Sequence, residues 1–108
     1  MRLLRPLAVL LALGFTGCTQ CERACRAQAL AYDDCLRDWG QEWRDLGADD
    51  VGGYRDLCIA TWDTHLAGLS DDDRAAESAQ CAELADDLTA ASTCEESRAA
   101  LQAYGSAD

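Results

Sequence analysis

The stretch CERACRAQALAYDDCLRDWGQEWRDL, residues 21–46, carries a regular helical pattern. Its cysteine, aromatic and aliphatic residues recur at steps of three and four, which places them on one face of a helix. Gly40 interrupts the pattern, since glycine costs about 1 kcal/mol relative to alanine inside a helix. We therefore expect a helix that kinks or ends near residue 40. Its apolar face consists of Cys21, Cys25, Ala29, Tyr32, Leu36, Trp39, Trp43 and Leu46.

Two further helices are expected beyond this stretch. After a loop at residues 47–53, the apolar positions of residues 54–69 mark a second amphipathic helix, with Gly68 as its C-terminal stop. Ser70 is a favoured N-cap for a third helix, which runs through Leu88 and has three aspartates in its first turn.

A fourth, shorter helix closes the chain. Ser92 and Glu95 resemble a capping box, which would open a helix through Tyr104. No alternating pattern of useful length predicts a strand. The sequence therefore predicts an all-α fold, either a small disulfide-stapled helical bundle or a helical hairpin stack.

Six cysteines in this helical region look like a disulfide framework, which commonly stabilises secreted domains of this size. Cys21 and Cys25 lie one helical turn apart, where Cβ atoms are about 5–6 Å from each other, whereas a disulfide needs about 3.5–4.5 Å. These two should therefore reach separate partners. Of the 15 connectivities that six cysteines allow, one candidate scheme is Cys35–Cys58, Cys25–Cys81 and Cys21–Cys94.

The first residues are typical of a targeting segment. Arg2 and Arg5 give a positive start, and Leu7–Phe15 is an apolar stretch of about nine residues, as in a signal peptide. A membrane-spanning helix needs about 20 apolar residues. Ala12–Gly14 offers the small residues that an ordinary signal peptidase reads, so one interpretation is a secreted protein cleaved there.

The next residues, Phe15-Thr16-Gly17-Cys18, are similar to the lipobox of bacterial lipoproteins. Seven cysteines are an odd number for a secreted protein, and modification of Cys18 would leave six that can pair completely. The resemblance implies a thioether-linked diacylglyceryl group on Cys18, often with a third acyl chain on its amine. It also implies three parts, which are a signal peptide at residues 1–17, a lipidated N-terminus and short tether at 18–20, and a cysteine-rich helical domain at 21–108.

The resemblance also implies a location. In lipoproteins of bacteria with two membranes, an aspartate directly after the lipidated cysteine often signals retention in the inner membrane, and this chain has Thr19 there. We expect a lipid-anchored protein of the cell envelope, in the outer membrane if the host has one. Cleavage by an ordinary signal peptidase would release a secreted protein instead.

The charge of the chain excludes one class of partner. Removal of residues 1–17 takes away Arg2 and Arg5, which leaves 9 − 2 = 7 basic residues against 20 acidic ones and a formal net charge of −13. Such a surface repels nucleic acid and anionic lipid headgroups. Basic partners and divalent cations remain open.

Candidate catalytic and metal-binding residues form weak patterns. The closest cysteines are spaced C-x-x-x-C, not the C-x-x-C of thiol redox catalysts and of many structural zinc sites. His65 is the only histidine, and Asp63 two residues away points in another direction on a helix. The aspartates at residues 71–73 splay from a helix start, whereas calcium wants six to eight surrounding oxygens. We therefore expect no catalytic residue, no metal site and no cofactor.

The function favoured by the sequence is that of a small acidic, non-catalytic lipoprotein of the cell envelope, a structural or protein-interaction module. The alternative is an envelope protein that binds a ligand or a divalent metal ion. The expected partners are the membrane, through the lipid on Cys18, and a protein. Trp39, Trp43 and Trp62 would suit a binding face, although aromatic residues at helical spacing more often belong to the core.

Overall fold

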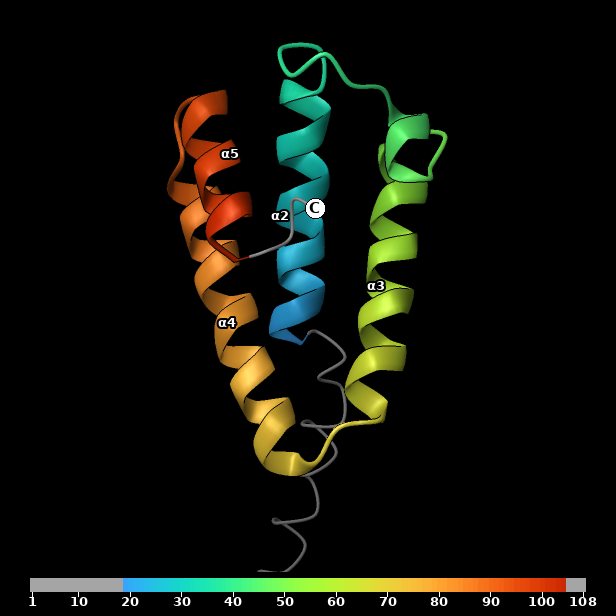
Figure 1. The fold of residues 1–108 in the computed structure, drawn as a ribbon, viewed down its shortest axis with the longest axis vertical. Helices are drawn as coiled ribbons and strands as arrows, with labels where there is room; N and C mark the ends of the chain where they lie inside the picture. The colour runs from blue at the N-terminus through green and yellow to red at the C-terminus, as the bar shows by residue number, and fades with distance from the viewer. Residues whose placement is uncertain (1–18, 105–108) are drawn as a thin grey trace, which may run out of the picture.

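The computed structural model describes residues 19–104, and these form helices without any strand (Figure 1). In chain order the elements are α2 (Gln20–Cys35), the 3-10 helix η1 (Trp43–Leu46), α3 (Val51–Ala67), α4 (Asp71–Ala90) and α5 (Cys94–Ala103). The prediction of a small, disulfide-stapled all-α fold is confirmed. Within the described range, no helix has the length and apolar character needed to cross a membrane.

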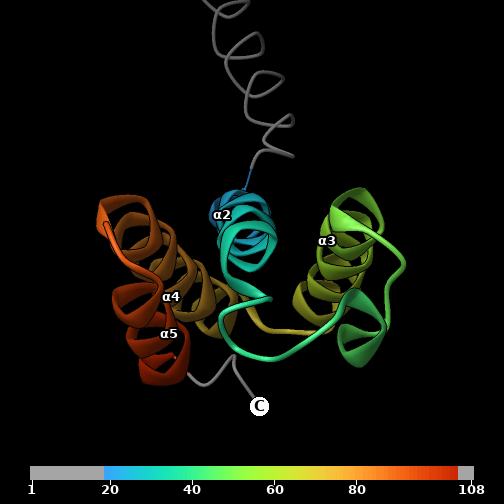
Figure 2. The same cartoon turned by 90° about the horizontal axis from the view of Figure 1, so that it is seen from above.

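Helix α2 is the central element, with α3 on one side and α4 and α5 on the other (Figure 1; Figure 2). Thr19 caps it, since its Oγ1 accepts a hydrogen bond from the N–H of Glu22 at 3.0 Å. Small side chains make up much of its buried stripe, so neighbouring helices can approach closely. The buried residues of α2 are Cys21, Ala24, Cys25, Gln28, Ala29, Tyr32 and Cys35.

The α-helix ends at Cys35, a few residues before the predicted end near Gly40. Turns carry the backbone on to Gly40, whose φ of +68° is left-handed. The N–H of Gln41 donates to the carbonyl of Leu36 at 2.9 Å, as in a Schellman motif. The predicted face beyond residue 40 is therefore not one continuous helix, and η1 brings its last members back onto the core.

The start of α3 differs from the prediction, whereas the turn into α4 agrees with it. Helix α3 begins at Val51, inside the expected loop, because Asp50 Oδ1 accepts the N–H of Gly53 at 2.8 Å and supports the first turn. Gly68 is the C-cap of α3, and Ser70 is the N-cap of α4, as expected.

The predicted capping box of the last helix is shifted by one residue. Thr93, not Ser92, is the N-cap of α5, and its Oγ1 accepts the N–H of Glu96 at 3.1 Å. The carboxylate of Glu96, rather than Glu95, reaches back and accepts the N–H of Ser92 at 2.7 Å. Hydrogen bonds from the backbone and hydroxyl of Ser92 lower the pKa of Glu96 below its ordinary value.

Three disulfides hold the helices together, and each has one cysteine on α2. The expectation that Cys21 and Cys25 reach separate partners is confirmed, but the candidate scheme is wrong in all three pairs. The pairs are Cys21–Cys81 with α4, Cys25–Cys58 with α3, and Cys35–Cys94 with α5.

The rise along the helix axis explains the correct pairing. Cys25 and Cys35 lie about 15 Å apart along α2. Helix α3 runs back alongside α2, so Cys58, about two turns into α3, comes level with Cys25 (Figure 1). Cys35, at the end of α2, instead meets Cys94 at the start of α5. Helix α4 begins beyond the N-terminal end of α2 (Figure 1). The middle of α4 therefore lies beside the start of α2, where Cys81 meets Cys21.

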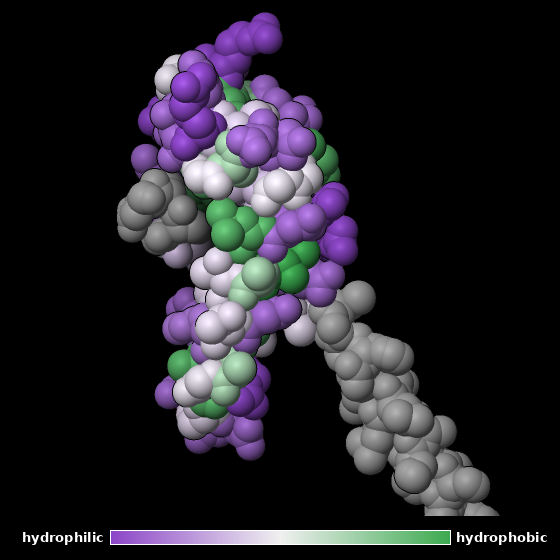
Figure 3. Space-filling view, turned by 90° about the vertical axis from the view of Figure 1, so that its right-hand side faces the viewer, coloured by the Kyte–Doolittle hydropathy of each residue, from purple (hydrophilic) through white to green (hydrophobic). Residues whose placement is uncertain are grey.

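Helix α3 is the most loosely packed of the long helices. Leu66 is its one buried residue. Besides one disulfide to α2, Tyr54 anchors it by packing edge-on against Tyr32, with ring centroids 5.3 Å apart. Figure 3 looks onto the side of the molecule where α3 lies and shows apolar residues open to solvent among charged ones. One apolar residue of α3, Leu57, is 47% exposed. The disulfide therefore replaces much of the core packing that α3 lacks.

We expect the double substitution Cys25→Ala, Cys58→Ala to lower the free energy of unfolding by about 2–4 kcal/mol, the usual contribution of a disulfide. The loss should concentrate in α3, because the described structure gives this helix little other burial. Hydrogen exchange followed by mass spectrometry would show amide protection falling first in residues 51–67.

The matched control is Cys35→Ala, Cys94→Ala, which removes the bridge to α5 instead. This variant should keep the protection of α3 and lose that of α5. Equal loss of protection over all helices in both variants would contradict the looser attachment of α3.

Candidate functional site

A cavity of about 210 Å³ lies between α3 and α4, with α2 as its floor. It exists because both helices pack on α2 instead of on each other along their length (Figure 2). Its walls combine apolar and polar side chains and include no arginine. The main lining residues are Ala24, Gln28, Trp62, Glu77, Leu84 and Tyr104.

The side chain of Gln28 is the unusual member of this lining. Gln28 is only 4% exposed, and its nearest polar contact joins Oε1 to Cys58 Sγ at 3.6 Å. Cys58 is bonded to Cys25 and so has no S–H to donate. As placed, the amide oxygen has no hydrogen-bond donor among residues 19–104. A buried amide without a partner costs about 1–3 kcal/mol, and this cost singles out Gln28 as a candidate ligand contact.

The helical period explains why Gln28 faces the cavity. At about 100° per residue, Gln28 lies about 20° from Cys21 and about 60° from Cys25 around α2, so it shares the buried face that carries these two cysteines. Cys25 lies toward α3 and Cys21 toward α4, as their disulfides require. Tyr32 is covered by the ring of Tyr54, but Gln28 borders the open space between the two helices.

A tryptophan and a glutamate line this space from different helices. Trp62 lines the cavity from α3 and Glu77 lines it from α4. The nearest partner of the Glu77 carboxylate is His65 Nε2 at 4.0 Å, too far for a hydrogen bond. The His65 ring packs edge-on against Trp62, with centroids 5.5 Å apart. In the described structure the carboxylate therefore keeps its capacity to accept hydrogen bonds.

Tyr104 forms the edge of the cavity at the end of α5. Its hydroxyl donates to Asp87 Oδ2 at 3.0 Å and lies 3.3 Å from Glu83 Oε1, both on α4. Desolvation, followed by the hydrogen bond and negative charge of Asp87, raises the pKa of Tyr104 to about 12. The residue therefore ties α5 to α4 beside the cavity.

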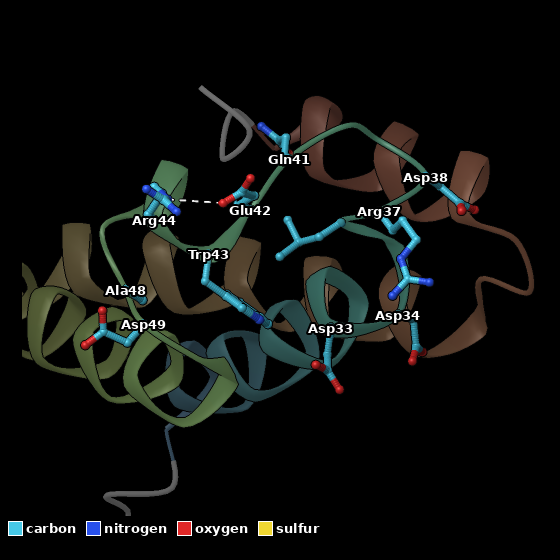
Figure 4. A pocket seen from close by; sticks show the side chains of 11 residues that line it. Asp33, Asp34, Arg37, Asp38, Gln41, Glu42, Trp43, Arg44, Ala48 and Asp49 are labelled. Atoms are coloured by element: carbon cyan, nitrogen blue, oxygen red, sulfur yellow. Dashed lines mark hydrogen bonds and ion pairs between the residues drawn. The ribbon is translucent and has the colours of Figure 1, made fainter.

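A second, wider depression lies at the opposite end of α2, around η1 (Figure 4). Its volume is about 1090 Å³ and charged side chains dominate its lining. Figure 4 shows the carboxylates, such as those of Asp33, Asp38 and Asp49, fanning out instead of converging, while Arg44 pairs with Glu42 at 3.1 Å. Across residues 19–104, no group of three or more His, Cys, Asp or Glu side chains is placed to hold a metal ion.

The sequence candidates for catalysis and calcium binding lie apart. His65 contacts Trp62 and Glu77, and Asp63 is exposed elsewhere on α3. The aspartates at residues 71–73 form the exposed first turn of α4, where Ser70 Oγ accepts the N–H of Asp73 at 3.1 Å. Their interpretation as a solvated helix start is confirmed.

The three tryptophans do not share one binding face. Trp43 packs against Tyr54, and Trp39 packs against Tyr32 and lies under the guanidinium of Arg98. Trp62 stands apart from them at the cavity. All three are partly buried against the hydrophobic core, as the helical spacing indicated.

Gln28 was missed at the level of sequence. The predicted stripe passes from Cys25 to Ala29 in a step of four, although Gln28, a step of three from Cys25, lies on the same face. A polar residue inside a stripe of small apolar ones was the available signal.

Cys18, the predicted lipidation site, and the signal segment lie outside the described residues. Comparison of the chain with protein-family models, with curated proteins and with solved structures gives no match. The cysteines and the cavity are therefore the features of this chain that bear on its function.

The tyrosines supply a test of the packing around the site. Burial raises the pKa of Tyr32 and of Tyr54, and that of Tyr104 is raised to about 12, so all three phenols of the chain should ionise above the ordinary value of 10.0. The fold favours the neutral phenol. This stabilisation is complete below pH 10 and is lost as the pH rises through the raised pKa values.

Absorbance at 295 nm during an alkaline titration should therefore rise later in the native protein than in the denatured protein, whose midpoint should lie near pH 10. Tyr104→Phe should remove the component near pH 12 and leave the other two. Coincident native and denatured curves would contradict the packing of these rings.

Proposed function

We propose that the protein is a lipid-anchored, non-catalytic binding module of the bacterial cell envelope. One observation supports the lipid anchor. The six cysteines from Cys21 onward pair completely with one another, so Cys18 is the odd cysteine of the seven. That cysteine ends the lipobox-like run Phe15–Cys18, at the position that lipoproteins modify.

The fold suits an anchor at this position. Helix α2 begins at Gln20 and is capped by Thr19, so the lipid would be attached next to the helix that carries all three disulfides. Each buried methylene contributes about 0.8 kcal/mol, and two or more acyl chains give stable anchoring. The absence of aspartate at position 19 supports the outer membrane, if the host has one.

The lipid, rather than the protein surface, would provide the attraction to the membrane. The turn from α3 into α4 extends beyond the start of α2 and would lie nearest the bilayer (Figure 1). Its three exposed aspartates, residues 71–73, would be repelled by anionic headgroups.

The cavity between α3 and α4 supports the binding role. Its buried, unpartnered Gln28 favours a ligand-binding protein as the specific form of this function. The three disulfides join the helices that form the cavity walls to α2.

Mass spectrometry of the mature protein from its host tests the anchor. The mature chain should start at Cys18 and carry the added mass of a diacylglyceryl group and acyl chains. It should also enter the detergent phase in a Triton X-114 partition. Cys18→Ala should abolish both the lipid mass and the detergent partition, because the thioether cannot form.

Gln20→Ala is the matched control, since Gln20 lies close to the motif but outside it and is exposed. This variant should remain lipid-modified. An unmodified wild-type N-terminus at Phe15 would overturn the anchor and leave a secreted protein.

A further inference from the structure

The contact between Gln28 and the disulfide indicates which end of the amide faces the cavity. The structure has Oε1 3.6 Å from Cys58 Sγ. A disulfide sulfur can accept a weak hydrogen bond but cannot donate one, and the two ends of an amide exchange by a half-turn. The amide nitrogen is therefore favoured beside the sulfur, which turns the carbonyl oxygen toward the cavity as an acceptor.

Two other side chains of the cavity, Glu77 and Trp62, also suit a donor with positive charge. The carboxylate of Glu77 accepts no hydrogen bond from His65 at 4.0 Å. Trp62 adds the ring type that attracts cations most strongly. The lining contains no arginine to occupy these acceptors.

Two wider features agree with a cationic ligand. The chain from residue 18 onward has a formal net charge of −13, which raises the local concentration of cations around it. The protein also uses the same chemistry internally, since the guanidinium of Arg98 lies 5.7 Å from the centre of the Trp39 ring.

We propose that this cavity binds an alkylguanidinium group, such as that of arginine. Gln28 and the Glu77 carboxylate accept its N–H groups, and Trp62 lies beside it. A planar guanidinium offers five donors, is weakly hydrated and stacks on aromatic rings. The volume of about 210 Å³ is below the roughly 300–1,000 Å³ of common ligand pockets, so it suits one group of side-chain size. The inference rests on the ligand-binding form of the proposed function.

Isothermal titration calorimetry tests the charge requirement. The mature protein, purified from its host in whatever form it occurs there, is titrated with n-butylguanidinium and with n-butylurea. The two probes have the same planar shape and differ in charge. We expect one saturable site for n-butylguanidinium and binding of n-butylurea at least tenfold weaker. Equal affinities, or no binding of n-butylguanidinium, would overturn the proposal.

Substitutions test the assigned residues. Gln28→Leu keeps a similar volume but removes the acceptor, so it should weaken n-butylguanidinium binding at least tenfold while the melting temperature stays the same or rises. Glu77→Gln should also weaken binding, because it removes the carboxylate charge. Gln102→Leu, on the exposed side of α5 outside the cavity, is the matched control and should bind as the wild type does. A Gln28→Leu protein with a lower melting temperature and unchanged binding would assign Gln28 a structural role instead.

Peptide probes distinguish a free ligand from a side chain of a partner protein. Citrulline is the uncharged, isosteric counterpart of arginine, so Ala-Arg-Ala and Ala-citrulline-Ala with blocked ends form a matched pair. If the arginine peptide binds at least as tightly as n-butylguanidinium, the site is supported and its ligand is an arginine side chain of a partner protein. If n-butylguanidinium binds and the peptide does not, the site is supported and its ligand is a free small molecule. The binding result does not depend on the lipid at Cys18, so failure of either proposal is visible separately.

Discussion

The covalent attachment of three helices to α2 is the constraint on which the rest of the described structure depends. Cys21, Cys25 and Cys35 lie on this one helix and reach α4, α3 and α5 respectively. A disulfide typically contributes about 2–4 kcal/mol, and the net stability of a domain is about 5–15 kcal/mol. The combined contribution of the three bridges is therefore comparable to the whole net stability of so short a chain. They also allow α3 to remain in place with Leu66 as its one buried residue.

The same arrangement creates the cavity. Because α3 and α4 are each fixed to α2, they do not need to pack against each other, and part of the buried face of α2 borders an open space between them. At Tyr32 an aromatic ring from α3, that of Tyr54, packs on this face. At Gln28 the neighbouring ring, Trp62, forms a wall instead of a lid. A buried amide without a partner is a departure from the usual pairing of polar groups, and such departures concentrate at functional sites.

The proposed location and the proposed ligand fit the same physical picture. Disulfides persist in the oxidising compartments outside the cytoplasm, where a lipid on Cys18 would hold the protein at a membrane. A strongly acidic surface attracts cations, and an acceptor-lined cavity with a tryptophan favours a flat one. The lipid would determine where the protein is located, and the cavity would determine which ligand it binds.

Local sequence signals were sufficient for the helical class and for several helix ends. Gly40 acts through its left-handed backbone and Ser70 through side-chain capping, both within one turn, so their effects could be predicted without a partner helix. The disulfide pairing and the site required the three-dimensional arrangement. Which cysteine meets Cys25 depends on where α3 starts and how far it rises beside α2, and a few residues of error at Val51 change the answer. The burial of Gln28 likewise depends on two helices standing on either side of it, and no local period along the chain contains that information.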